Sequence, residues 1–217
     1  MNGRREYDIG QTVLGEEIKL YEIPPSSFAK AKPAVLLYGA IHGDEPLGVY
    51  CLVKMIEELI AKPPGRPTWI IPALNLDGLS ANSKNNANDV DLNRNFAASN
   101  WQSEHKEGYH PGSEPESEPE IKALVKAIEM SKATRLIALH SPFRTVNYDG
   151  SAQKLAEEMG RLNGYGASAS IGYPTPGSFG SKYGVDLDNE VITLEIPPQD
   201  EESAWRENRA ALRHTVD

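Results

Sequence analysis

The stretch AVLLYGAIHGDEP, residues 34–46, decides the fold class of this chain. It opens with five apolar residues in a row, which is the pattern of a strand buried on both faces of a sheet. Similar apolar runs occupy residues 135–140 and 191–196, and segments with helical periodicity lie between the runs. Strands that alternate with helices in this way predict an α/β fold built on a mostly parallel sheet.

Outward from this stretch, the whole chain divides into alternating strands and helices. In chain order we predict a β-hairpin over 9–23, strands at 34–41, 68–74, 135–140 and 191–196, and helices at 46–61, 118–131, 151–162 and 200–214. We expect one domain, residues 1–217, in which helices flank a central mixed, mostly parallel twisted sheet as an α/β sandwich. The long segments 75–116 and 164–190 are expected to build a functional site, because loops of more than about 15 residues in compact domains are usually functional.

Composition limits the possible partners. The formal net charge is −9 and no basic run is present, which weighs against a nucleic-acid partner because such binding depends on clustered Lys and Arg. No apolar stretch approaches the roughly 20 residues that cross a bilayer, and none follows the first residues as in a secretory signal. We therefore expect a cytoplasmic protein without a membrane partner. The single cysteine, Cys51, lies in an apolar helical segment and is expected to be a packed side chain rather than a nucleophile.

Three side chains of metal-binding type lie at or just beyond the ends of the apolar runs. His42 and Glu45 form an H-x-x-E pair at a strand-to-helix turn, where Pro46 suits the first helical position, and His140 ends the second run. Ligands of open α/β sheets bind beyond the carboxyl ends of the strands, so these three residues can converge. Each of them alone is more often structural, but together they match the three ligands that zinc takes in hydrolases. The pattern predicts one zinc ion per chain.

Glu195 has the setting of a catalytic carboxylate. It lies inside the third apolar run, where an ionisable group is costly to bury unless it has a partner or a function. The alternative is a solvent-exposed carboxylate on an edge strand. Hydrolysis at zinc needs a base that takes a proton from water and returns it to the leaving amine, and we predict that Glu195 has this role.

Together these motifs resemble the zinc carboxypeptidase (carboxypeptidase A-like) family. The matching elements are the H-x-x-E pair His42–Glu45, NLDG at 75–78, VDLNRNF at 90–96, SEPE at 117–120, and His140 and Glu195 as third ligand and catalytic acid/base. Within the family, PGSEPE at 111–116, GYPTPGSFGS at 172–181 and EIPP at 195–198 are most similar to bacterial murein peptide amidases.

This resemblance implies a function and a substrate. It implies a cytoplasmic zinc metallopeptidase that hydrolyses the bond between γ-D-glutamate and meso-diaminopimelate in murein tripeptide during peptidoglycan recycling. The partner would be a small peptide. Two other functions remain open, a zinc amidohydrolase that deacylates N-acyl amino acids and a zinc-binding regulatory protein with weak or no turnover.

The resemblance also implies roles for two cations. Asn93 and Arg94 would hold the terminal carboxylate of the substrate, Arg94 as a charge-assisted fork; alternatively, Arg94 pairs with Asp89 or Asp91 as scaffolding. Lys84 stands where the family usually has an arginine that polarises the scissile carbonyl. A lysine offers a point charge rather than a planar fork, so this position departs from the family pattern.

Further predictions concern the remainder of the pocket. Arg144 is a third cation that could bind an anionic substrate, and either Tyr173 or Tyr183 could be the tyrosine that covers it. The bonds Ser141–Pro142 and Pro197–Pro198 are predicted to be cis, because the family has cis peptides at these positions and proline lowers their cost to roughly 0.5–1 kcal/mol.

Overall fold

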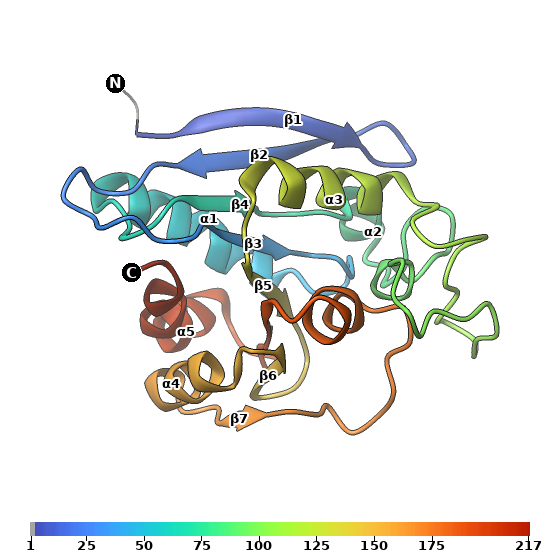
Figure 1. The fold of residues 1–217 in the computed structure, drawn as a ribbon. Coiled ribbons are helices and arrows are strands. Elements are labelled where there is room, and N and C mark those ends of the chain that lie inside the picture. Colours follow the sequence, from blue (N-terminus) through green and yellow to red (C-terminus); the bar gives the residue numbers. More distant parts are fainter. Residues whose placement is uncertain (1–2) are drawn as a thin grey trace.

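Eight strands form one sheet within residues 3–217, the part of the chain that this computed structural model describes (Figure 1). Their order across the sheet is β1-β2-β4-β3-β5-β8-β6-β7. The strands are β1 (Arg5–Gln11), β2 (Glu17–Ile23), β3 (Val35–Gly39), β4 (Thr68–Ile71), β5 (Arg135–His140), β6 (Thr145–Gly150), β7 (Ala167–Ser168) and β8 (Glu190–Glu195). The helices are α1 (Leu47–Ala61), α2 (Leu76–Ala81), α3 (Pro119–Ser131), α4 (Gln153–Asn163) and α5 (Glu201–Val216), with a 3₁₀ turn, η1 (Leu92–Arg94), and a π-helical segment, η2 (Gly180–Asp186).

The centre of the sheet is parallel. β4, β3, β5 and β8 run in one direction, while β2 joins β4 and β6 joins β8 in antiparallel pairs. The predicted mixed, mostly parallel sheet is therefore confirmed. Because the four central strands end at the same edge, the segments that follow β3, β5 and β8 meet there, which is where ligands bind in open α/β sheets.

The apolar run of β3 is buried on both faces of the sheet. Val35 and Leu37 pack into a core with α1, α4 and α5, whereas Leu36 and Tyr38 pack into a second core with α3 and η2. Successive side chains of a strand point to opposite faces, so a run without polar alternation needs cover on each side. Figure 1 shows α4 and α5 on one side of the sheet and α3 on the other. No helix within residues 3–217 is both long and apolar enough to span a membrane.

Several elements form outside the predicted helices and strands, among them α2, β6, β7 and η2. α2 forms in the polar segment 75–116, where Asn75 caps it by accepting a hydrogen bond from the Gly78 amide. β6 forms after β5, although its Asn, Asp and Gly disfavour a strand, because it pairs with β8 along its whole length. β7 and η2 lie within 164–190, and both pack against β6. At β6, β7 and η2, contacts between distant segments outweigh local propensity.

Two local predictions are decided by the structure. Cys51 is fully buried in α1, and burial raises the pKa of its thiol to about 12, so it is a packed side chain as predicted. The Ser141–Pro142 bond is cis, and it is the one cis bond within residues 3–217. The prediction of a cis Pro197–Pro198 bond is therefore wrong.

Candidate active site

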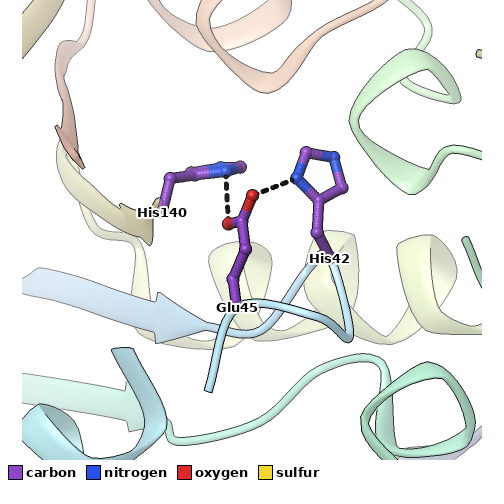
Figure 2. Close-up of side chains that lie close together, drawn as sticks. All are labelled: His42, Glu45 and His140. Atoms are coloured by element: carbon purple, nitrogen blue, oxygen red, sulfur yellow. Dashed lines mark hydrogen bonds and ion pairs between the residues drawn. The ribbon is translucent and has the colours of Figure 1, made fainter. Parts of the chain in front are cut away.

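His42, Glu45 and His140 meet at the carboxyl edge of the sheet. Beyond β3 the backbone turns through Ala40, whose φ of 48° lies in the left-handed region, and brings His42 and Glu45 beside the end of β5. Figure 2 shows the Glu45 carboxylate between the two imidazole rings. The Nδ1 atoms of His42 and His140 lie 2.9 Å and 3.1 Å from the two carboxylate oxygens. All three ligand atoms lie within 4.8 Å of one another.

This donor set suits zinc. Two imidazole nitrogens and one carboxylate at such separations are a set that zinc takes in hydrolases, with a further position left for water. Burial lowers the pKa of His42, but hydrogen bonds with Asp91 and Glu45 outweigh it and raise that pKa to about 9. A metal ion binds the neutral form of imidazole. A metal ion that binds at His42 must therefore displace the extra proton that the raised pKa favours on this ring.

Asp91 orients the first ligand. Its Oδ1 lies 3.1 Å from Nε2 of His42, which leaves Nδ1 of that ring facing Glu45. Burial opposes ionisation of Asp91, but the bond with His42 and nearby positive charges hold the pKa of this carboxyl well below its usual range. A carboxylate on the second nitrogen of a metal-binding histidine fixes the orientation of the ring. The sequence alone indicated no such role for Asp91, although the residue belongs to the VDLNRNF motif at 90–96.

Glu195 lies beside the third ligand. It pairs in register with His140 across β5 and β8, and it is buried with a relative exposure of 4%. Because β8 lies between β5 and β6, the alternative of an exposed edge-strand carboxylate is wrong. Burial, opposed by the charge of His140 and aided by that of Glu45, raises the pKa of Glu195 above its usual value.

A cavity of about 1230 Å³ opens in front of these residues. Its walls include Lys84, Arg94 and Tyr173 in addition to the two histidines and both glutamates. The long segments predicted to build a site, 75–116 and 164–190, supply much of this lining. Most of the predicted site residues therefore share one pocket.

Comparison with known proteins identifies the family. A model of the zinc carboxypeptidase family matches residues 4–215 of the chain. The chain belongs to the zinc carboxypeptidase family. Murein peptide amidase A of Escherichia coli strain K12 is 31% identical to this zinc carboxypeptidase over 205 residues, covering 87% of this chain and 80% of the relative.

Solved structures agree with this assignment. Murein-tripeptide amidase MpaA from Escherichia coli O157 superposes with a TM-score of 0.78 at 26% identity and covers 100% of this chain and 98% of that chain. Carboxypeptidase A from Helicoverpa armigera superposes at 0.84 with 19% identity, covering 99% and 68%, and shows the shared fold. This zinc carboxypeptidase is thus a hydrolytic enzyme of a zinc-dependent family.

Lys84 of this zinc carboxypeptidase is held within the pocket. Its Nζ donates to Oδ2 of Asp91 at 2.5 Å and to the carbonyl of Gly108 at 3.0 Å, and it lies 3.7 Å from the centre of the Tyr109 ring. Tyr109 was not singled out by the sequence, because its position in a polar segment carries no periodic signal. Two of the three donors of the ammonium are engaged, which leaves one for a ligand.

Arg94 and Asn93 line the same pocket. Arg94 is 7% exposed and donates from Nη1 to the carbonyl of Asn93 at 2.7 Å, while Oδ1 of Asn93 accepts a hydrogen bond from the Phe179 amide. Asp91 pairs instead with Lys84 at 2.5 Å and with His42 at 3.1 Å. The alternative in which Arg94 pairs with Asp89 or Asp91 is not observed within residues 3–217; a substrate-binding role for Arg94 stays a prediction.

The structure separates the other candidate residues. Tyr173 lies on the pocket wall with 44% exposure, whereas Tyr183 is 6% exposed and packs against Phe179 in the core. Tyr173 is therefore the one of the two that can face a substrate. Arg144 lies outside the pocket lining, where it pairs with Glu207 at 3.2 Å; its predicted role in substrate binding has no support from this geometry.

Proposed function

We propose that this enzyme hydrolyses the amide bond before the C-terminal residue of a small peptide, with one zinc per chain held by His42, Glu45 and His140. The proposed substrate is murein tripeptide, cut between γ-D-glutamate and meso-diaminopimelate. The observation that carries the proposal is the convergence of the three ligands and Glu195 in a pocket that also contains Arg94. The names of the relatives above support the substrate.

The residues of the pocket divide the reaction between them. His42, Glu45 and His140 would hold a zinc ion, which when bound would supply Lewis acidity toward the scissile carbonyl and a water molecule. Glu195 accepts a proton from that water and returns it to the leaving amine nitrogen. Its burial raises the pKa of this carboxyl above the usual value, which makes it a stronger base toward that proton.

The two pocket cations serve different charges of the substrate. Arg94 binds the terminal carboxylate, which is present before the reaction begins. Lys84 directs its free donor to the oxygen of the scissile carbonyl, where negative charge develops. Because Lys84 is also bound to Asp91, its ammonium is held in place before the substrate arrives.

The test is a comparison of three substrates. Zinc-loaded protein is incubated with L-Ala-γ-D-Glu-meso-diaminopimelate, with an ordinary C-terminal L-peptide and with an N-acyl amino acid, and the products are identified by mass. We expect release of diaminopimelate from the first. Cleavage of the N-acyl amino acid alone would indicate the deacylase instead, and zinc-loaded protein that cleaves none of the three would indicate a binding protein. The expected cytoplasmic location is tested separately by cell fractionation.

A further inference from the structure

Tyr109 lies beside both cations of the pocket. Nζ of Lys84 is 3.7 Å from the centre of the Tyr109 ring, and Cζ of Arg94 is 5.3 Å from the same centre. All three residues line the cavity. An aromatic ring attracts a cation that lies over its face within about 6 Å of the ring centre. One side chain therefore contacts the two residues that the proposed function assigns to different charges of the substrate.

The backbone on either side of Tyr109 is bound to the same part of the pocket. The carbonyl of Gly108 accepts a hydrogen bond from Nζ of Lys84 at 3.0 Å, and the carbonyl of His110 accepts one from the amide of Asp91 at 2.8 Å. The φ of Gly108 is 77°, in the left-handed region that a glycine adopts without strain. Tyr109 is 39% exposed and belongs to neither apolar core. Contacts with the pocket, rather than burial in a core, therefore set its position.

An aromatic ring can hold cations without neutralising them. The carboxylate bound to Lys84 is that of Asp91, whereas Arg94 donates to a backbone carbonyl. The face of an aromatic ring carries partial negative charge but no net charge, so it attracts a cation and leaves the formal charge unchanged. Tyr109 thus contacts Lys84 and Arg94 in a way that keeps both charges available to an anionic substrate.

We propose that Tyr109 is a positioning residue whose ring holds Lys84 and Arg94 in place for the substrate and so contributes to both kcat and KM. The inference rests on the proposed function, which assigns Lys84 to the charge that develops on the scissile carbonyl and Arg94 to the terminal carboxylate. Lysine and arginine side chains lose much conformational freedom when they are held in one position. A ring that holds them before the substrate arrives removes part of this cost from binding and from catalysis.

The experiment measures kcat and KM of Tyr109→Leu and Tyr109→Phe with L-Ala-γ-D-Glu-meso-diaminopimelate. Leucine lacks an aromatic face, so kcat should fall and KM should rise, each by about two- to thirtyfold, the range of cation–π contacts. Tyr109→Phe keeps the ring and should leave both constants within about twofold.

Tyr50→Leu is the matched control for the loss of a ring beside a cation. Nζ of Lys54 lies 5.5 Å from the centre of the Tyr50 ring, but Tyr50 lies on α1 and is not part of the cavity lining. This variant should change neither kcat nor KM. Equal effects of Tyr50→Leu and Tyr109→Leu would contradict a specific role for Tyr109.

Double variants distinguish positioning from a general disturbance of the pocket. In a Lys84→Ala background, Tyr109→Leu should no longer lower kcat but should still raise KM. In an Arg94→Ala background, Tyr109→Leu should no longer raise KM but should still lower kcat. Such non-additivity is expected of side chains that act through one another. If the effects of Tyr109→Leu are the same in all three backgrounds, the positioning role is overturned.

A measurement on the protein without substrate separates this inference from the proposed function. Because Nζ of Lys84 lies over the Tyr109 ring, the NMR signals of the methylene protons next to Nζ should be shifted upfield. The shift should disappear in Tyr109→Leu and persist in Tyr109→Phe. If zinc-loaded protein cleaves no peptide, the proposed function fails, and this shift still decides whether Tyr109 holds Lys84. If the peptide is cleaved and Tyr109→Leu has normal kcat and KM, the positioning role fails and the peptidase activity stands.

Discussion

At the residue scale, Asp91 connects the metal site with the substrate pocket. Oδ1 of Asp91 lies within hydrogen-bond distance of Nε2 of His42 and accepts a hydrogen bond from the backbone amide of Asn93. Oδ2 accepts a hydrogen bond from Nζ of Lys84. The orientation of His42, the position of Asn93 and the position of the Lys84 ammonium thus depend on one buried carboxylate. Because His42, Asn93 and Lys84 share this partner, we expect a substitution at one of them to alter the effect of a substitution at another.

Glu195→Gln tests the general base. The amide keeps the size of the side chain and cannot carry the proton, so kcat should fall by at least about a hundredfold. Zinc content should remain that of the unaltered protein, because Glu195 is not a ligand. A variant that retains both zinc and a near-normal rate would contradict the mechanism.

Arg94→Ala and Lys84→Ala should change different kinetic constants. In the proposed mechanism Arg94 binds a charge present in the ground state and in the transition state, so its loss should chiefly raise KM. In the same mechanism Lys84 stabilises a negative charge that develops during the reaction, so its loss should chiefly lower kcat, by about ten- to a thousandfold.

Lys84→Arg and zinc content are the controls for this pair. Lys84→Arg should retain activity if its longer group can still reach Asp91. Zinc analysis of Lys84→Ala shows whether the change acts through Asp91 and His42 instead. An unchanged kcat in Lys84→Ala would mean that Lys84 has no part in stabilising the oxyanion.

At the element scale, the turn before α1 is held against α2 by two glycines. A Cβ on Gly43 would lie 2.0 Å from the carbonyl carbon of Gly78, and the Gly43 amide donates to the carbonyl of Lys84 at 3.2 Å. The side-chain Nδ2 of Asn75 also donates to the carbonyl of Lys84, at 3.3 Å. The turn that carries the first two metal ligands and the segment that carries Lys84 are therefore one packed unit.

Gly43→Ala should disturb this unit. The added methyl group meets backbone atoms, which cannot rotate away, so we expect a loss of about 1–3 kcal/mol in the free energy of unfolding. Zinc affinity should also fall, because His42 and Glu45 flank the displaced residue. Denaturant unfolding and metal titration measure the two effects. Gly3→Ala, where nothing lies within 4 Å of the added Cβ, is the control and should leave both unchanged.

At the scale of the whole molecule, the parallel sheet joins distant parts of the chain into one site. β3 and β5 are neighbours in the sheet, so Glu45 and His140 become neighbours in space although 95 positions separate them in the sequence. An ion that binds these ligands holds the loops after both strands together and binds only the folded chain. Binding to the folded state alone raises stability by mass action.

Zinc should therefore raise the melting temperature. At a free concentration of about one hundred times Kd the gain is about 2.7 kcal/mol. For a protein of this length that corresponds to an increase in Tm of roughly 5–10 °C. His140→Ala should lower zinc content sharply and remove the increase. A variant that still binds one zinc with full affinity would show that the ligand assignment is wrong.

The sequence by itself determined the central strands and the candidate metal ligands. Unbroken apolar runs identify buried strands because only a strand covered on both faces buries every residue, as in β3. The types and positions of His42, Glu45 and His140 indicated the zinc chemistry before their geometry was known. Family resemblance added the substrate-binding candidates.

Tertiary structure alone decided β6, the bond of Asp91 with His42, and which tyrosine faces the pocket. β6 depends on pairing with β8, and Asp91 meets a histidine 49 positions away. The positions of Tyr173 and Tyr183 differ because η2 turns one residue into the aromatic core and leaves the other on the wall. All three outcomes depend on contacts between distant segments, which local propensity and periodicity do not contain.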